Sequence, residues 1–135
     1  MEQKKYIFTG EILNWKGHIL HRIKRLSDGK IGEWIESELN LVNDIYYNVC
    51  WVDEEAKVYS NAYISGDAII YGNAEVYGNS HIFDNARIFD NAKVYNSKIA
   101  RRVKIYDNAK VFNSIYCDNE KIHNNTKINH NKDVI

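Results

Sequence analysis

The residues that most often carry catalysis are few in this 135-residue chain, and their spacing matches no catalytic motif. The two cysteines, Cys50 and Cys117, form neither the paired spacing of a zinc site nor a disulfide framework. The sequence contains no glycine-rich phosphate loop and no nucleophile elbow. We therefore expect no catalytic residue, no metal and no cofactor, and we expect both cysteines to be inward-facing, reduced and unpaired.

Arginine offers a different chemistry, because Arg101-Arg102 stands where the neighbouring sequence has Gly or Asp followed by Asn. Two guanidinium groups near Lys98 and Lys104 can hold phosphates or carboxylates, and the alternative is a solvated turn without a ligand. The formal net charge of the chain is zero. Residues 1–85 nevertheless carry 8 basic and 13 acidic residues, whereas residues 86–135 carry 10 and 5. This asymmetry favours head-to-tail contacts or an anionic partner at the C-terminal half.

A six-residue repeat must position these side chains. From residue 56 the sequence runs AKVYSN, AYISGD, AIIYGN, AEVYGN, SHIFDN, ARIFDN, AKVYNS. Alternate residues of a strand share a face, so the small residue and the aliphatic residue two places later point inward. The residue between them and the following Tyr or Phe point outward. The remaining Gly, Asn and Asp adopt positive φ at low cost and predict corners. The inward aliphatic positions are Val58, Ile64, Ile70, Val76, Ile82, Ile88 and Val94.

The repeat continues to the C-terminus if two of its units are five residues long instead of six. After Val94 we place the inward position at Ile99, Ile105, Val111 and Cys117, and a second five-residue step leads to Ile122, Ile128 and Val134. One further unit extends back to Cys50 and Val52. With three rungs per coil, the sequence predicts an all-β chain in which residues 50–135 form a parallel β-helix of about five coils, roughly 24 Å long.

Residues 1–49 lack the repeat and predict a β-hairpin-like cap within the same domain. Residues 5–13 and 18–26 have the composition of two strands joined through residues 14–17, and residues 27–30 form a clear turn signal. A solenoid needs such an end, because an open terminal coil exposes strand edges and an apolar cross-section.

The repeat resembles the hexapeptide repeat of left-handed β-helix proteins, which are best known as trimeric acyltransferases. Because periodicity does not give the hand of the coils, their left-handedness is implied by this resemblance. The segments GHILHRI (17–23), GEWIESELNL (32–41) and CWV (50–52), followed by Val-Tyr-Gly-Asn-Ala repeats, are similar to the YdcK-like hexapeptide-repeat proteins of bacteria, phages and prophages. The usual Gly-Gly-Trp-Ile of that family is Gly-Glu-Trp-Ile in this chain.

The resemblance to acyltransferases implies a catalytic histidine in a subunit cleft, often beside a loop extruded from a coil. No such loop interrupts residues 50–117, and only His81 lies on a regular outward rung. His81, His123 and His130 also lack the one-coil spacing of a shared metal site. We interpret His81 as a solvated residue of the outer surface.

Outward aromatic and basic residues are the more informative feature. Stacked aromatic residues stabilise neighbouring strands, and continuous exposed apolar stripes usually meet a partner. We assign an interaction surface to one ladder of Tyr59, Tyr77, Tyr95 and Phe112, to a second ladder of Tyr71, Phe89 and Tyr106, and to the basic residues Arg87, Lys98, Arg101, Arg102 and Lys104.

These patterns favour a non-enzymatic accessory protein that binds a host or phage protein, for instance a defence nuclease that it inhibits in the manner of an anti-CRISPR protein. The phage origin is implied by the resemblance alone. Self-association as a dimer or trimer is also expected. Two alternatives remain: a hexapeptide-repeat acyltransferase, and a nucleic-acid contact through the basic C-terminal half with a steep salt dependence. No leader and no membrane span is recognisable, so we expect no membrane contact and a cytoplasmic location, in the host cell if the protein is phage-encoded.

Overall fold

The computed structural model describes residues 4–44 and 49–129, in which all regular secondary structure is β-strand. The first three strands are the longest: β1 (Tyr6–Trp15), β2 (His18–Arg25) and β3 (Ile31–Ile35). Two- and three-residue strands follow, separated by corners: β4 (Trp51–Val52), β5 (Lys57–Val58), β6 (Tyr63–Ile64), β7 (Ile69–Ile70), β8 (Glu75–Tyr77), β9 (His81–Ile82), β10 (Arg87–Ile88), β11 (Lys93–Tyr95), β12 (Lys98–Ile99), β13 (Lys104–Ile105), β14 (Lys110–Phe112), β15 (Ile115–Tyr116), β16 (Lys121–Ile122) and β17 (Lys127–Asn129).

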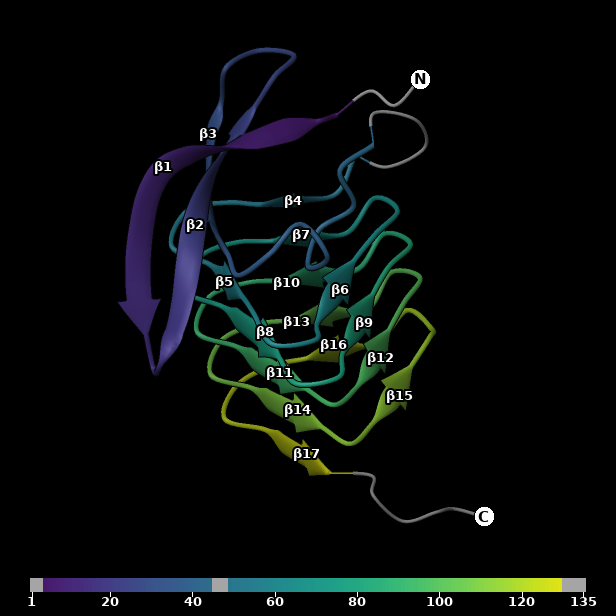
Figure 1. The fold of residues 1–135 in the computed structure, drawn as a ribbon. Coiled ribbons are helices and arrows are strands. Elements are labelled where there is room, and N and C mark those ends of the chain that lie inside the picture. Colours follow the sequence, from purple (N-terminus) through teal and green to yellow (C-terminus); the bar gives the residue numbers. More distant parts are fainter. Residues whose placement is uncertain (1–3, 45–48, 130–135) are drawn as a thin grey trace.

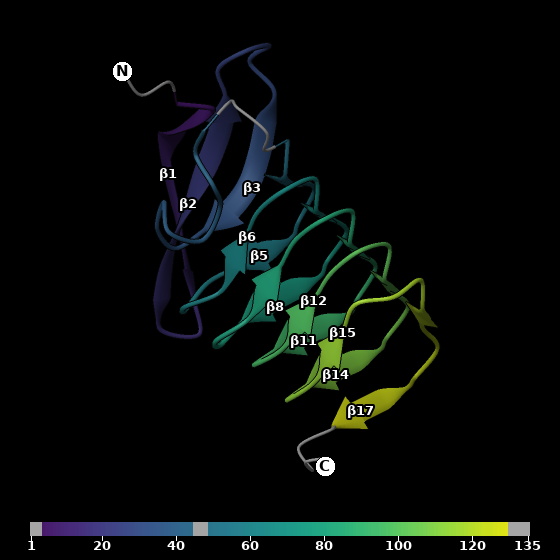
Figure 2. The same ribbon diagram turned by 90° about the vertical axis from the view of Figure 1, so that its right-hand side faces the viewer.

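The short strands stack in parallel on three faces and form a β-solenoid of about five turns (Figures 1 and 2), which confirms the predicted fold class. Face A consists of β5, β8, β11, β14 and β17, and the three cap strands extend it to an 8-stranded sheet. Face B consists of β6, β9, β12 and β15, and face C of β4, β7, β10, β13 and β16. Each complete turn therefore adds one strand to each face.

The coils are left-handed, as the resemblance implied. In Figure 1 the chain passes from β5 at the front left to β6 at the front right and then to β7 at the back, each step lying farther from the cap. Seen from the cap, the chain turns counter-clockwise as it recedes, which defines a left-handed coil.

The inward register agrees with the repeat over its regular part. Ile70, Val76, Ile82 and Ile88 are wholly buried, and the preceding small residues line the same interior. The corners adopt positive φ as expected: at the corner between faces B and C, Gly66, Asp84 and Arg101 have φ of 64°, 56° and 55°. Backbone N–H groups donate to carbonyls of the next coil, so the ladder satisfies the polar groups that the corners would otherwise leave buried.

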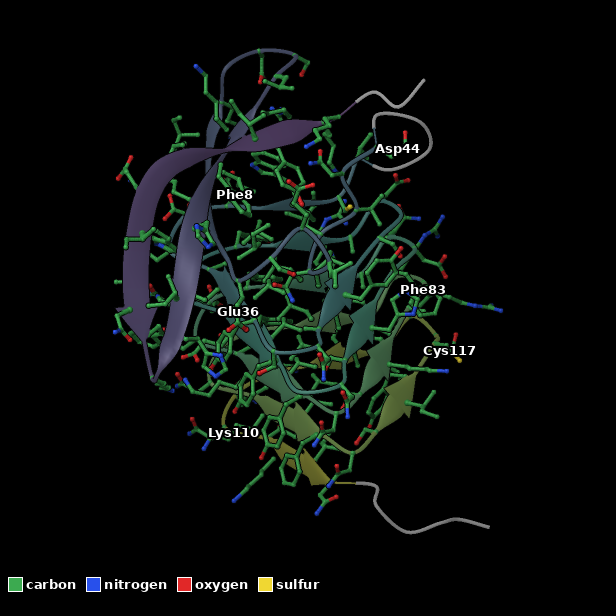
Figure 3. All side chains as sticks on the ribbon, in the orientation of Figure 1. Phe8, Glu36, Asp44, Phe83, Lys110 and Cys117 are labelled. Atoms are coloured by element: carbon green, nitrogen blue, oxygen red, sulfur yellow. The ribbon has the colours of Figure 1, made fainter. Side chains whose placement is uncertain are left out.

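The predicted position of Cys117 is wrong. Tyr116 pairs with Ile99 and packs against the core, whereas Cys117 is exposed on the outside of face B, on the same side of the solenoid as Phe83 (Figure 3). The second five-residue step comes one coil after the first, at the same corner between faces A and B. Ser114 stacks on Ser97 there, donating its backbone N–H to the Ser97 hydroxyl at 3.1 Å. A stacked corner repeats the shape of the corner beneath it, so the shortening recurs 17 residues later. Val134 lies outside the described residues.

The cap is more closely joined to the solenoid than a separate hairpin would be. β1 and β2 pair antiparallel, as do β2 and β3, but β3 then pairs in parallel with β5. Leu41 forms a parallel bridge with Ile64 of face B. Parallel stacking therefore begins at β3, before the sequence repeat that starts near residue 50.

Candidate interaction surface

The face A ladder stacks its rings in a column along the solenoid. Ring centroids are 5.1 Å apart for Tyr59 and Tyr77, 4.9 Å for Tyr77 and Tyr95, and 4.9 Å for Tyr95 and Phe112, with interplanar angles of 4°, 13° and 3°. The ring faces therefore cover one another, so only the ring edges can face outward.

The upper end of this ladder is not a free surface, which corrects the assignment of Tyr59. Its side chain is only 3% exposed, because the tip of the β1–β2 hairpin folds over face A. Leu20 and Trp34 complete a small buried cluster with Tyr59, and Leu13, Trp15 and Tyr77 pack against it. The chain itself thus occupies the first two rungs of the ladder.

Glu75 binds the tip of the hairpin. Its outward position in the repeat predicted an exposed residue, so the sequence did not reveal this role. It is 5% exposed, and its Oε1 accepts hydrogen bonds from Tyr59 Oη at 2.8 Å and Trp15 Nε1 at 3.2 Å. Lys16 and Lys93 each lie 3.5 Å from its carboxylate oxygens. Burial raises the pKa of Glu75, but these hydrogen bonds and lysines outweigh it, so the pKa is lowered overall. Burial of a charged carboxylate is tolerated here because both of its oxygens have partners.

The face C ladder stacks in the same way and is one ring longer than expected. Centroid distances are 4.8 Å for Tyr71 and Phe89, 5.0 Å for Phe89 and Tyr106, and 5.1 Å for Tyr106 and His123. His123 follows the inward Ile122 as Tyr106 follows Ile105, so the repeat register held the signal for this fourth ring. All four residues are half-buried.

The basic residues assigned to the interaction surface do not converge on one site. Arg87 Nη1 donates to the backbone carbonyls of Asp67 at 2.8 Å, Asn85 at 3.1 Å and Ala86 at 3.1 Å, so its guanidinium stabilises a corner. Arg101 and Arg102 are exposed at the corner between faces B and C, with Lys98 and Lys104 on the adjoining strands. In a three-sided coil this corner lies opposite face A, so one compact partner site does not hold both the arginines and the face A ladder.

Cations of the lower coils lack the ion pairs found in the cap. Within residues 4–44 and 49–129, no carboxylate lies within ion-pair distance of Lys98, Arg101, Arg102, Lys104, Lys110, Lys121 or Lys127. Several of these cations stand in register above one another: Lys110 and Lys127 on face A, and Lys104 and Lys121 on face C. Like charges directly opposite across strands are destabilising, so these columns favour an anionic partner.

His81 lies in an aromatic cluster on face B. Its ring is 4.9 Å from Tyr63 and 4.4 Å from Phe83, and its Nε2 lies 3.1 Å from Ser65 Oγ. Burial and the nearby Lys98 lower the pKa of His81. In the described part of the chain no carboxylate hydrogen-bonds this imidazole, so the Ser–His contact lacks the third group that orients a catalytic base.

The described residues contain no cluster of three or more His, Cys, Asp or Glu arranged to hold a metal ion, and none of their elements is a helix that could cross a membrane. Comparison with protein-family models and with curated proteins gave no match to this chain. The fold and surface define a β-solenoid with two stacked aromatic ladders and exposed basic residues on its lower coils.

Proposed function

We propose that this chain is a non-catalytic binding protein that holds an acidic protein partner on the lower part of face A. The observation that carries the proposal is the docking of the chain's own hairpin on the upper part. There, Trp15 and Leu13 pack over the ladder while Lys16 meets Glu75, so ring edges plus a charged neighbour already bind a protein segment. The lower rungs, Tyr95 and Phe112, offer the same ring edges without a described segment over them.

The charge beside the lower rungs differs from that beside the upper rungs and indicates the chemistry of the partner. Glu75, Lys93, Lys110 and Lys127 form one column of side chains along face A. Lys110 and Lys127 lie one and two coils beyond Lys93, and both are exposed. A complementary surface would place apolar side chains on the ring edges and carboxylates against the two lysines. Aromatic residues are enriched at the centre of protein–protein interfaces, and complementary charges around them speed association and select the partner.

Nucleic acid is the second candidate, favoured by the unpaired cations of the lower coils. Two features weigh against it. Sequence-tolerant binding of single strands relies on bases stacking on aromatic ring faces, and in both ladders those faces cover each other. The carboxylates of Asp90 and Asp107 also stand at the corner between the two lysine columns, where they would repel a continuous polyphosphate. The separate carboxylates of a protein surface fit this arrangement better.

The resemblance to YdcK-like proteins suggests a host or phage protein as the partner, including a host defence nuclease whose action the chain would block. An acyltransferase remains the enzymatic alternative, with Ser65 and His81 as the residues to test. Its support is limited to the 3.1 Å contact between these two side chains.

The proposal is tested by capturing partners from a host lysate with immobilised wild-type chain and with Tyr95→Glu/Phe112→Glu, followed by photo-crosslinking from position 112. We expect an acidic protein that the wild type retains, that the double variant loses, and that crosslinks to position 112. His81→Ala should retain it. Loss confined to Arg101→Glu/Arg102→Glu would place the contact at the opposite corner and contradict face A. Capture of nucleic acid alone would favour the second candidate.

A further inference from the structure

A buried amine and a buried thiol meet where the cap begins on the first coil, away from the partner site proposed on face A. Lys5, which precedes β1, is 6% exposed, and Cys50, which precedes β4 at the cap end of the solenoid (Figure 1), is wholly buried. Lys5 Nζ donates hydrogen bonds to the Cys50 carbonyl oxygen at 2.7 Å and to Cys50 Sγ at 3.2 Å. The two reactive groups come from positions 45 residues apart.

The thiol of Cys50 is a departure from the repeat. Cys50 occupies the small-residue position of its unit, which Ala56 and Ala62 occupy in the next two units. The interior therefore does not require a sulfur atom in this place. The second thiol of the chain, that of Cys117, is exposed about four coils farther along, which at about 4.8 Å per coil is beyond the reach of a disulfide.

The charges of the two groups depend on each other. Burial lowers the pKa of Lys5 and raises the pKa of the Cys50 thiol, and the attraction between the two groups opposes both shifts. The Lys5 ammonium group thus stabilises the thiolate, which is the form that reacts with peroxides. Once the sulfur has been oxidised to a neutral group, it no longer stabilises the ammonium group, so the nucleophilic amine form of Lys5 is favoured.

We propose that this pair is a site of oxidative modification, at which hydrogen peroxide joins Lys5 Nζ to Cys50 Sγ by a covalent S–N bond. The thiolate attacks one peroxide oxygen, the O–O bond breaks, and the departing hydroxide takes a proton from the ammonium group to form water. The amine then attacks the sulfur of the sulfenic acid, the S–O bond breaks, and the hydroxyl leaves as water with a proton from the nitrogen. Sulfur loses two electrons and peroxide gains them, so one peroxide yields one bond and two waters.

Lys5 is the nucleophile that the geometry places beside this sulfur. A sulfenic acid condenses with a neighbouring thiol or nitrogen. The backbone nitrogens of Cys50 and Trp51 donate to carbonyls of the next coil at 3.0 Å and 3.1 Å, so both are held in the ladder. Hydrogen peroxide is little larger than water, and the chain neighbours of the pair, Lys4 and Val49, are exposed. The sulfur therefore lies close beneath the surface of the cap.

The bond would fasten the start of the cap to the first coil and close a loop that contains the whole β1–β2 hairpin. Such a closure restricts the unfolded chain and stabilises the folded one, as a disulfide does. Because the hairpin covers the upper rungs of face A, the modification would hold the cap in place under oxidising conditions. The lower rungs proposed for the partner are not part of this site, so either proposal can fail without the other.

The test treats the full chain carrying Cys117→Ser, which removes the exposed thiol, with hydrogen peroxide. The protein is then unfolded, its thiols are alkylated and its peptides are mapped by mass spectrometry. The expected product joins the fragments that hold Lys5 and Cys50 and is lighter by two hydrogen atoms than the two fragments together. Dithiothreitol should separate them and make Cys50 alkylatable again. Before reduction, the melting temperature should be higher by about 5 °C or more.

Two variants in the same background are the controls. Lys5→Gln keeps a hydrogen-bond donor but has no nucleophilic amine, so Cys50 should gain oxygen without a joined peptide. Cys50→Ala carries the usual residue of the repeat, should be folded by circular dichroism, and should show no change in melting temperature on peroxide treatment. Three results would each overturn the proposal: a Cys50 that stays alkylatable, oxygen added to Cys50 without a joined peptide although Lys5 is present, or a loss of two hydrogens confined to the Cys50 fragment.

Discussion

The upper and lower halves of face A share one backbone register but differ in what covers them. On the upper rungs, Tyr59 and Glu75 are buried beneath the hairpin. On the lower rungs, the residues in the same columns, Phe112 and Lys110, are half-buried and exposed. The position within the repeat therefore determines where a side chain points, and the cap determines whether it reaches solvent.

The charges follow the same division. Cap cations are paired within the chain: Arg25 Nη2 lies 2.7 Å from Asp28, Lys30 lies 3.1 Å from Asp53, and Arg22 contacts Glu33 at 3.2 Å. In the lower coils the exposed lysines stand above one another without such partners among the described residues. The cap therefore occupies the charged groups of the upper surface, whereas those of the lower coils face solvent.

The largest expected effect comes from the interior, which both halves share. Ile88→Ala should lower the free energy of unfolding by about 2–5 kcal/mol, since a wholly buried side chain is replaced by a cavity. Denaturant unfolding followed by circular dichroism measures it. Lys104→Ala, which changes an exposed residue on the same face, is the control and should stay within about 0.5 kcal/mol. Equal losses for both variants would contradict the inward register.

A smaller effect should distinguish the two halves directly. Glu75→Ala should cost about 1–3 kcal/mol, because it leaves Tyr59 Oη and Trp15 Nε1 buried without their acceptor. Lys110→Ala removes a residue from the same column one coil below Lys93 and should cost no more than about 0.5 kcal/mol. Similar losses at both positions would mean that the hairpin does not stabilise face A.

The pH dependence of the Glu75 contribution follows from its lowered pKa. A carboxylate whose pKa is lower when folded stabilises the native state above its ordinary pKa of about 4.3, and this contribution is lost as the pH falls through the folded pKa. The difference in unfolding free energy between wild type and Glu75→Ala should therefore be constant near neutrality and narrow below about pH 4.3. A difference that widens on acidification would contradict the charged, hydrogen-bonded state of Glu75.

The sequence predicts what the repeat controls and misses what depends on contacts between distant segments. Alternation in short strands was enough to place Ile82 inside and the Tyr77 and Phe89 ladders outside. It could not place the second short step, because the deciding contact is Ser97 against Ser114 on neighbouring coils. The burial of Glu75 was equally hidden, since Trp15 and Lys16 reach it from 60 and 59 residues away. The ring positions of the face A ladder were thus predicted correctly, whereas the burial of Tyr59 at its upper end was not.

The smallest effect concerns a corner of the lower half where local strain and charge meet. Arg101 has a φ of 55°, whereas Arg102 is not among the positive-φ residues. Arg101→Gly should raise the free energy of unfolding by about 0.5–1 kcal/mol, because relief of about 1–2 kcal/mol of left-handed strain exceeds the added entropy of the unfolded glycine. Arg102→Gly, the matched control, has no such strain to relieve and should lower stability by about 0.5–1 kcal/mol. Both free energies come from denaturant unfolding. If Arg101→Gly were as destabilising as Arg102→Gly, the Arg101 side chain itself would stabilise the corner, and the left-handed strain assigned to Arg101 would be contradicted.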